Sequence, residues 1–386
     1  MSVQLKVGLI VNPIAGMGGK VGLHGTDLAS FAVALSLGAQ PTSGLRTVRA
    51  LAGLVNEQEL FDFYAAAGVM GGDYLEEAGI SYTRILNFAS DRKSGAGDTR
   101  AIASSLIEVG VDIILFSGGD GTARDIFSVI GGKIPIIGIP AGVKMRSEVF
   151  GIYPESIAGI LISQAQSSVG TRVREAEILD VSELPNRNGI WDTELFGVAL
   201  TPNATQHIQC SKISGESHAD IGLCELANAM AKEMAPGKLY LIGPGRSAYL
   251  ILQEQGLVGS FVGVDALVDG QVIGRDLSED AILALLERFE KRELILGVIG
   301  GQGFLLGRGN QQISARVISA IGFDAITIMA SARKISALIP ARLHIDLGES
   351  DIYALIPQYI QVHTAPNRTI LCSTEVPAND NVMTTV

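Results

Sequence analysis

Short apolar runs that end in glycine-rich turns and continue into helical patterns recur along this chain of 386 residues. The runs are QLKVGLIVNP (4–13), VDIILFSGGDG (111–121), IPIIGIP (134–140), KLYLIGPG (238–245) and LILGVIGG (294–301). A strand, a turn and a helix repeated in this order are typical of parallel sheets whose strands are joined by crossover helices. We therefore predict an α/β protein.

Two other regions alternate apolar and polar residues, as strands with one solvated face do. They lie at 171–202, where the loop PNRNG separates two such runs, and at 342–373. We predict a Rossmann-like parallel-sheet domain at 1–145, followed at 146–372 by a mixed α/β domain with some antiparallel strands. Residues 373–386 have little to bury and are predicted to form a flexible tail.

The composition argues against several classes of protein. The formal net charge of −11 disfavours a broad nucleic-acid surface. No apolar run approaches the roughly 18 residues of a membrane-spanning helix, and the first residues lack the basic head and cleavage site of a signal peptide. Three scattered cysteines fit a reducing compartment. We expect a soluble, cytoplasmic protein with no membrane or nucleic-acid partner.

The turn SGGDGT (117–122) places a carboxylate among glycines directly after a buried strand. Glycines let successive backbone N–H groups face one point, and the next helix adds its positive N-terminus, so such a turn binds anions. An acid beside a phosphate is repelled unless it holds Mg²⁺ or takes a proton from an attacking hydroxyl. The alternative is a tight turn in which Asp120 only caps the helix. The flanking strand and the following residues TARD favour phosphoryl transfer.

Several motifs, taken in order, resemble those of the ATP-NAD kinase / AcoX (acetoin catabolism) family. GGDGT is similar to the signature of a superfamily that joins NAD kinases, diacylglycerol and sphingosine kinases, and phosphofructokinases. The matching segments are VNPIAGMGGKVGLHGTD (11–27), AGDTR (96–100), ILFSGGDGTARD (114–125), GIPAGVKM (138–145), IGPG (242–245) and GGQGFLLGRGNQQIS (300–314). The resemblance covers most of the chain and implies a kinase that acts on nucleotides and forms a homodimer.

The resemblance also implies a role for each matching position. Asp120 takes the proton of the acceptor hydroxyl, Asn12 contacts the nucleotide or its phosphates, and Thr122 lines the site. The glycines that hold phosphates or allow close backbone approach are Gly16, Gly18, Gly19, Gly118, Gly119 and Gly121. An asparagine suits this work because one amide both donates and accepts hydrogen bonds. For Asn12 the alternative is a turn that only ends the first strand.

Cationic side chains near these turns are candidates for further phosphate contacts. Arg100 and Lys144 are the two that we predict to bind the nucleotide, whereas Arg124 either reaches a phosphate or lies in solvent. Arg146 stands where the family usually has a histidine, so the cation is kept but a proton-transfer role is not. Asp125 is predicted to complement the dipole of the helix that follows the turn.

A second glycine turn, IGPG, has the strand–loop–helix form of a sugar-phosphate or nucleotide site. We predict that Gly243 and Gly245 bind the substrate there. Arg308 and Asn310, in the polar segment GRGNQQIS, are also predicted to contact the substrate. The alternative for this segment is a polar surface turn.

Histidines and cysteines between residues 207 and 224 have the chemistry of zinc ligands but lack the short, paired spacing of zinc sites. Cys224 falls within a helical pattern, where it is predicted to be a small apolar core residue. We predict no metal site built from protein ligands.

We expect an enzyme that transfers phosphate from ATP, or from polyphosphate, to NAD and so forms NADP, with Mg²⁺ bridging the donor phosphates. The sequence has no P-loop of the form GxxxxGK[ST], so the nucleotide is held by the glycine turns instead. Two alternatives stay open. One is a related kinase with a lipid or polyol acceptor. The other is a non-catalytic protein that binds a dinucleotide or sugar phosphate and is linked to acetoin catabolism.

Overall fold

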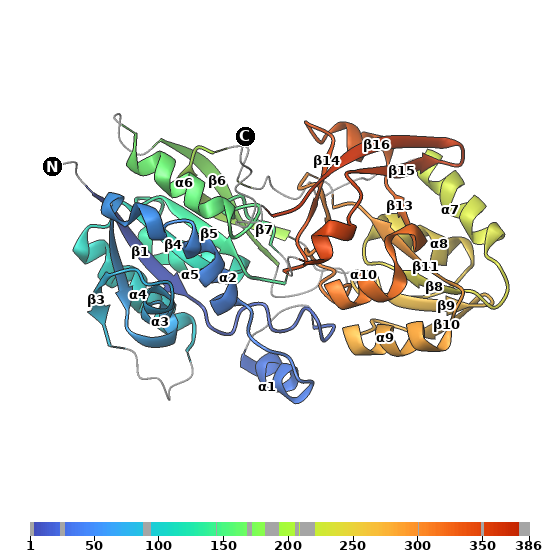
Figure 1. The fold of residues 1–386 in the computed structure, drawn as a ribbon, viewed down its shortest axis with the longest axis horizontal. Helices are drawn as coiled ribbons and strands as arrows, with labels where there is room; N and C mark the ends of the chain where they lie inside the picture. The colour runs from blue at the N-terminus through green and yellow to red at the C-terminus, as the bar shows by residue number, and fades with distance from the viewer. Residues whose placement is uncertain are drawn as a thin grey trace. The chain divides into compact units, whose positions relative to one another are not determined.

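The computed structural model describes residues 4–23, 28–87, 94–143, 145–167, 172–181, 193–204, 208, 221–299, 301–348 and 351–377 (Figure 1). The chain divides into two compact units. The first comprises Met1–Met17, Gly25–Ser36 and Gln40–Ser211, and the second comprises Gly18–His24, Leu37–Ala39 and Lys212–Val386. The first unit therefore extends to Ser211, whereas the sequence predicts a domain boundary at residue 145.

The first unit contains a five-stranded parallel sheet in the order β3-β2-β1-β4-β5. Its strands are β1 (Leu5–Val11), β2 (Phe61–Ala66), β3 (Tyr82–Leu86), β4 (Ile113–Gly118) and β5 (Ile136–Pro140). The helices are α1 (Leu28–Ser36), α2 (Ser43–Ala52), α3 (Gly72–Glu77), α4 (Ala96–Val109), α5 (Asp120–Ile130) and α6 (Ser156–Ala165), with the 3₁₀ helices η1 (Val55–Leu60) and η2 (Gly68–Met70). The predicted parallel α/β arrangement of the N-terminal part is confirmed.

Both faces of this sheet are covered, which explains why its strands are almost continuously apolar. Leu9 of β1 points into a core shared with Leu51 of α2 and with α3 and α6. The next residue, Ile10, points to the opposite face, where Leu106 of α4 and Ile126 of α5 pack. Because successive side chains of a strand alternate between faces, one short run of apolar residues supplies both cores.

The antiparallel hairpin of β6 (Val173–Val181) and β7 (Thr193–Pro202) lies within the first unit. Its buried residues, Ala176, Ile178 and Ala199, pack into the core that α4 and α5 also share. On α5, Arg124 forms an ion pair of 2.9 Å with Asp180, and its guanidinium lies 5.2 Å from the centre of the Phe196 ring. The hairpin therefore joins the first unit because its apolar face is buried against α5.

The second unit contains a nine-stranded mixed sheet in the order β10-β9-β8-β11-β13-β15-β16-β14-β12. Its strands are β8 (Leu239–Ile242), β9 (Asp265–Val268), β10 (Gln271–Gly274), β11 (Arg292–Gly297), β12 (Phe304–Leu306), β13 (Ile326–Met329), β14 (Arg342–Ile345), β15 (Tyr359–Ala365) and β16 (Arg368–Glu375). The pairs β8–β9, β9–β10 and β15–β16 are antiparallel, and the others are parallel. This confirms the mixed sheet predicted for the C-terminal part.

Helices also pack on both faces of this second sheet. They are α7 (Ile221–Glu233), α8 (Arg246–Glu254), α9 (Glu279–Arg288), α10 (Ala315–Ile321) and α11 (Ala332–Ser336), with the 3₁₀ helices η3 (Phe323–Ala325) and η4 (Asp351–Leu355). Leu241 of β8 faces the core formed with α9 and α10, whereas Ile242 faces the core formed with α7 and α8. Among the residues described, no helix is long and apolar enough to cross a membrane.

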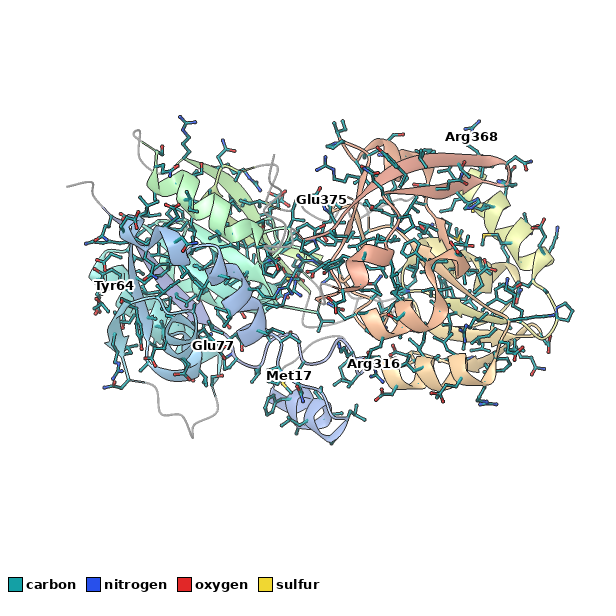
Figure 2. The ribbon with its side chains drawn as sticks, in the orientation of Figure 1. Met17, Tyr64, Glu77, Arg316, Arg368 and Glu375 are labelled. Atoms are coloured by element: carbon teal, nitrogen blue, oxygen red, sulfur yellow. The ribbon has the colours of Figure 1, made fainter. Side chains whose placement is uncertain are left out.

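The glycine-rich segment after β1 is shared between the two units, because Met17 ends the first and Gly18 begins the second. Within the second unit, the Lys20 carbonyl accepts a hydrogen bond of 3.0 Å from the Glu279 amide at the start of α9. The Glu279 carboxylate also lies 3.9 Å from Lys20 Nζ and 3.6 Å from Arg316 of α10, which is labelled in Figure 2. This acid therefore fixes the segment to the second unit.

Candidate functional site

The predicted phosphate turns meet at the carboxyl edge of the first sheet, where β1, β4 and β5 end side by side. The Asn12 amide donates to the Ser117 carbonyl (2.9 Å), and the Ala141 amide donates to the Gly118 carbonyl (3.1 Å). From β1 the strand order runs outward to β2 and β3 on one side and to β4 and β5 on the other. In open α/β sheets such a reversal of strand order is where ligands bind.

Asp120 is the first residue of α5, but its side chain does not cap that helix, since Gly119 is the N-cap. The carboxylate instead accepts hydrogen bonds from the segment that follows β5. Arg146 N lies 3.0 Å from Oδ1 and 2.8 Å from Oδ2, while Ser147 N and Ser147 Oγ lie 3.0 and 2.8 Å from Oδ1. The simple helix-capping alternative is therefore wrong, and Asp120 holds a neighbouring loop.

Burial dominates the electrostatics of Asp120, whose exposed fraction is 5%. It raises the pKa of Asp120 from the usual 3.8 to about 6, against the opposing effects of the hydrogen bonds from Ser147 and Arg146 and of the Arg146 charge. A carboxyl group with a pKa close to neutrality can accept and release a proton at physiological pH. Asp120 thus has the chemistry that a general base requires.

Asn12 and Thr122 connect the end of β1 to the first turn of α5. Asn12 Nδ2 donates to Thr122 Oγ1 at 3.0 Å, and Asn12 Oδ1 accepts from the Ile14 amide at 3.3 Å. The predicted turn at Asn12 is therefore present, and its side chain also reaches the GGDGT segment. Both ends of the Asn12 amide are used to fix the shape of the two loops.

We expect Asn12→Ala and Thr122→Val each to lower the free energy of unfolding, with a coupling of about 1 kcal/mol between them. The reason is that each substitution removes one partner of the same partly buried hydrogen bond. Urea unfolding of the two single variants and the double variant measures this coupling. Strictly additive effects would show that this hydrogen bond contributes nothing to the free energy of unfolding.

Two glycines at this edge are required by close packing. Gly16 has φ of 81°, and a Cβ placed on it would collide with the Thr42 hydroxyl and the Ala141 carbonyl. A Cβ on Gly142 would come within 2.7 Å of the Gly119 Cα. The loops after β1, β4 and β5 therefore approach one another too closely for any side chain at these two positions.

The other predicted glycines occupy different surroundings. A Cβ on Gly118 would collide with the Thr122 side chain, whereas Gly121 faces open space. Gly18 and Gly19 belong to the second unit, where a Cβ on Gly19 would lie 2.9 Å from the Gln311 Cβ. Within the first unit, Gly16 is the glycine of GMGG that lies at the same sheet edge as Gly118.

Two of the cations considered as phosphate ligands, Arg100 and Arg124, form ion pairs with acidic side chains. Arg100 forms an ion pair with Asp125 of 2.8 Å that joins α4 to α5, and Arg124 pairs with Asp180. Asp125 therefore has a specific partner beyond the helix dipole, and Arg124 does not simply lie in solvent. Lys144 lies outside the described residues.

Sequence reasoning missed three polar side chains at the same edge. Arg46 of α2 donates its Nε–H to the Pro140 carbonyl at the end of β5, and Ser117 Oγ donates to the Ser43 carbonyl at 3.2 Å. Ser147 is buried against Asp120. Ser147 directly follows the segment GIPAGVKMR, but no local pattern reveals its partner, because Asp120 lies 27 positions away.

In the second unit, the predicted glycine turn joins β8 to α8. The Gly243 amide donates to the Ile295 carbonyl (2.8 Å), and the Gly245 amide donates to the Phe261 carbonyl (2.9 Å), so both amides are used within the unit. Lys334 Nζ lies 3.4 Å from Ser247 Oγ on the first turn of α8. A cation from α11 therefore stands beside this turn.

Arg308 and Asn310 are not part of a surface turn, since their exposed fractions are 2% and 4%. Asn310 Nδ2 donates to the Leu305 carbonyl at 2.8 Å, and Asn310 Oδ1 accepts from the Gly307 amide at 2.9 Å. The Arg308 guanidinium lies 4.6 Å from the centre of the Phe304 ring. The surface-turn alternative is wrong, and the Asn310 amide closes its own loop.

Within the described residues, no three His, Cys, Asp or Glu side chains gather as ligands of a metal ion would. Of the candidate zinc ligands, residues 207, 210 and 218 lie outside the described part, and Cys224 lies on α7. Asp120 is the acid at the GGDGT turn, and both of its oxygens already accept hydrogen bonds. The described side chains therefore do not form a Mg²⁺ site by themselves at this turn.

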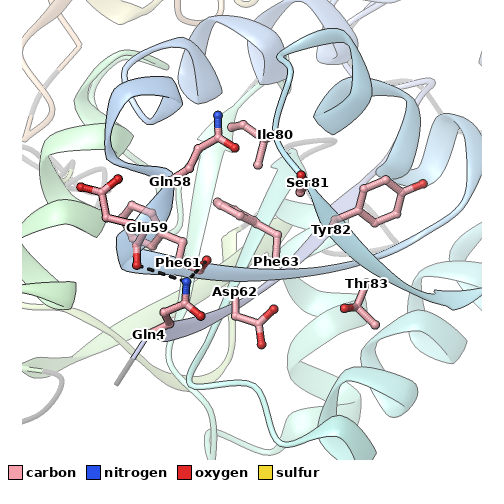
Figure 3. Close-up of a pocket in the computed structure, with 10 residues that line it drawn as sticks. All are labelled: Gln4, Gln58, Glu59, Phe61, Asp62, Phe63, Ile80, Ser81, Tyr82 and Thr83. Carbon is pink, nitrogen blue, oxygen red and sulfur yellow. Dashed lines mark hydrogen bonds between the residues drawn. The ribbon is translucent and has the colours of Figure 1, made fainter. Parts of the chain in front are cut away.

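A hollow on the first unit lies at the opposite edge of the sheet (Figure 3). It is lined by Gln4, Gln58, Glu59, Phe61, Asp62, Phe63, Ile80, Ser81, Tyr82 and Thr83, at the amino ends of β1, β2 and β3. Gln4 Nε2 donates to the carbonyls of Glu59 and Phe61 there. Since ligands of parallel α/β sheets bind at the carboxyl ends of strands, we do not assign the substrate to this hollow.

Comparison with protein families gives two matches. The model described as ATP-NAD kinase N-terminal domain matches residues 7–166, and the model described as ATP-NAD kinase C-terminal domain matches residues 240–374. Together they cover most of the chain, in the order of the two units. No curated protein and no solved structure matches.

Proposed function

Because the chain belongs to the ATP-NAD kinase family, we propose that it transfers a phosphoryl group from ATP to NAD and forms NADP. The matched domains are those of a kinase-type transferase. We also propose ATP and NAD as the substrates, with polyphosphate as the alternative donor, and a position of the chain in the AcoX branch of the family. We further propose that it works in the cytoplasm as a homodimer.

The surroundings of Asp120 give this proposal its main support. It is a buried carboxyl group with a pKa of about 6, positioned beside a glycine turn at the switch point of a parallel sheet. Its Oδ1 faces two fixed amides and a hydroxyl, whereas Oδ2 faces the Arg146 amide alone. Oδ2 is therefore the more basic oxygen and the one that would receive a proton.

In the proposed reaction, the O–H bond of an acceptor hydroxyl breaks and its proton moves to Asp120 Oδ2. The electron pair left on the acceptor's oxygen forms a bond to the γ-phosphorus of ATP. The bond from that phosphorus to the oxygen that bridges it to ADP breaks, and ADP leaves. The backbone amides of Gly119 and Gly121 and the N-terminus of α5 would stabilise phosphate charge. A divalent cation such as Mg²⁺ would arrive with the nucleotide phosphates.

We propose further contacts between the substrates and the residues described above. Asn12 and Thr122 would border the donor phosphates, with Gly16 and Gly118 allowing their close approach. In the second unit, Lys334 and the Ser247 hydroxyl, which lie beside the turn of Gly243 and Gly245 at the N-terminus of α8, would bind a phosphate or sugar group.

One observation favours a second candidate, a non-catalytic protein that binds a dinucleotide or sugar phosphate. Both oxygens of Asp120 accept hydrogen bonds, so the acid also serves to hold the loop at Arg146 and Ser147. If this is its whole purpose, the chain binds its ligand without turnover.

Incubation of the full chain with NAD and Mg²⁺, with ATP or polyphosphate added separately, tests the proposal by chromatographic detection of NADP. NADP formed with either donor supports the kinase and identifies the donor. No NADP with either donor, together with calorimetric binding of NAD, contradicts the kinase and favours the binding protein. Phosphorylation of a lipid or polyol instead of NAD would contradict the proposed acceptor.

A further inference from the structure

The hydroxyl of Ser147 has more hydrogen-bond partners than it has protons. Its Oγ lies 2.8 Å from Asp120 Oδ1, 3.0 Å from the Leu179 carbonyl oxygen and 3.0 Å from the Leu179 amide nitrogen. The Leu179 amide is a donor, so it occupies one lone pair of Oγ. Among the described residues, Asp120 and the Leu179 carbonyl are then both within reach as acceptors of the single Ser147 proton.

The surroundings make this arrangement rigid. Ser147 has an exposed fraction of 0%, and Asp120 is also buried. Leu179 lies on β6. The segment that contains Ser147 runs beside this strand, since the Glu148 amide donates to the Glu177 carbonyl at 3.0 Å. The amides of Arg146 and Ser147 cannot turn away from Asp120, whereas a hydroxyl can rotate. Ser147 is therefore the adjustable donor among the groups around the carboxylate.

We propose that Ser147 is a positioning residue whose hydroxyl proton points to Asp120 when that acid is ionised and turns to the Leu179 carbonyl when the acid is protonated. This inference rests on the proposed function, in which Asp120 accepts a proton. No covalent bond of Ser147 changes, because its proton stays on Oγ and only its direction alters. The proton received from the substrate resides on Asp120 Oδ2.

The rotation serves a buried acid that must exist in two charge states. A buried polar group without a hydrogen-bond partner raises the free energy of the folded protein. The hydrogen bond from Ser147 to Asp120 weakens once the carboxyl group is protonated, because its negative charge is then gone. With the Leu179 carbonyl as second acceptor, the hydroxyl keeps a partner in both states. Neither state of Asp120 then leaves the Ser147 proton without an acceptor.

The charged groups that the structure describes near Asp120 do not provide the same adjustment. Arg146 acts on Asp120 through its charge, and this favours the ionised form in every orientation of Ser147. On the elements that pack around the segment, Arg124 pairs with Asp180, and Arg174 lies 3.4 Å from Glu148. These pairs largely neutralise their own charges, so the Ser147 hydroxyl is the group expected to respond to the titration of Asp120.

Titration of the Asp120 carboxyl group in the full chain without nucleotide tests this proposal. The probe is the carbon-13 resonance of aspartate carboxyls, assigned by its loss in Asp120→Asn. In wild type we expect a midpoint near pH 6. Ser147→Ala should raise the midpoint by about one unit, because a hydrogen bond to the ionised form is lost. Ser147→Thr, which keeps a hydroxyl, should return it toward the wild-type value.

Ser128→Ala is the matched control, because Ser128 lies on α5 and donates to the Asp125 carbonyl at 2.7 Å rather than to Asp120. It should leave the midpoint of Asp120 unchanged. An unchanged midpoint in Ser147→Ala would overturn the proposal and leave Ser147 a purely structural residue. If Ser147→Ala does not fold, Ser147→Cys carries the same test, since a thiol is a weak donor of similar size. Titration needs no turnover, so its result is separable from failure of the kinase proposal.

Activity gives a second readout if NADP is formed. The acid limb of the pH profile of kcat/KM should move upward in Ser147→Ala by the same amount as the carboxyl midpoint. A lower rate with an unshifted acid limb would contradict the proposal, because loss of packing alone changes the rate without changing the proton affinity of Asp120.

Discussion

Replacement of Asp120 by asparagine is expected to lower the turnover of NAD to NADP by about 10²–10⁴-fold, which is the usual contribution of a general base. The amide keeps the size of the carboxyl group but cannot accept the proton of the acceptor hydroxyl. Its oxygen can still accept from Ser147 N and Ser147 Oγ, so the loop keeps two of its anchors. Single-turnover formation of NADP measures the effect on the chemical step.

Asp125→Asn is the matched control for this experiment. Asp125 lies on the same helix, carries the same charge and pairs with Arg100 rather than with the loop around Asp120. We expect its turnover to stay within severalfold of wild type. Calorimetric titration with NAD should give similar affinities for both variants. Turnover of Asp120→Asn close to that of wild type would exclude Asp120 as the base.

The position of the site could be predicted from the sequence because it depends on local order along the chain. A strand that ends at Gly118 and a helix that starts at Asp120 place the turn at a carboxyl edge wherever the strand lies in the sheet. Asn12 follows β1 in the same way. Parallel strands bring their carboxyl ends to one edge, so both turns are expected at that edge. They meet there because β1 pairs with β4.

The partners of the charged residues could not be predicted, because they depend on contacts between distant segments. Arg100 lies near the turn in sequence, but the packing of α4 on α5 gives it Asp125 as partner. The segment GRGNQQIS is polar and rich in glycine, yet Asn310 is buried and closes its own loop. The residue type determines which groups a side chain can bind, whereas the fold determines which partner it contacts.

The surroundings of Asp120 show the same limit at the centre of the site. The GGDGT pattern indicates a carboxylate beside a phosphate turn, but it contains nothing about Arg146, Ser147 or Leu179. These residues reach Asp120 because β5 lies next to β4 and β6 runs beside the segment that follows β5. The hairpin of β6 and β7 therefore belongs functionally to the first unit, since Leu179 supports the serine that contacts the acid.

The burial of Asp120 also predicts a pH dependence of stability with an unusual sign. The pKa of Asp120 is raised in the folded protein to about 6, from 3.8 for an unperturbed acid. Between these two values the folded state binds a proton that the unfolded state has released. Stability due to this group is therefore greatest at low pH and falls as the pH rises through the window. A carboxylate stabilised by an ion pair would have the opposite effect.

Asp120→Asn should consequently gain stability relative to wild type by about 2 kcal/mol as the pH rises from about 4 to about 7. Every other titrating group is shared by the two proteins, so it cancels in the difference between their free energies of unfolding. Urea unfolding across this pH range, followed for the first unit, measures that difference. A flat difference would mean that burial does not raise the pKa of Asp120. A difference of opposite sign would mean that the hydrogen bonds from Arg146 and Ser147 outweigh burial, in which case Asp120 is too weak a base at neutral pH for the proposed reaction.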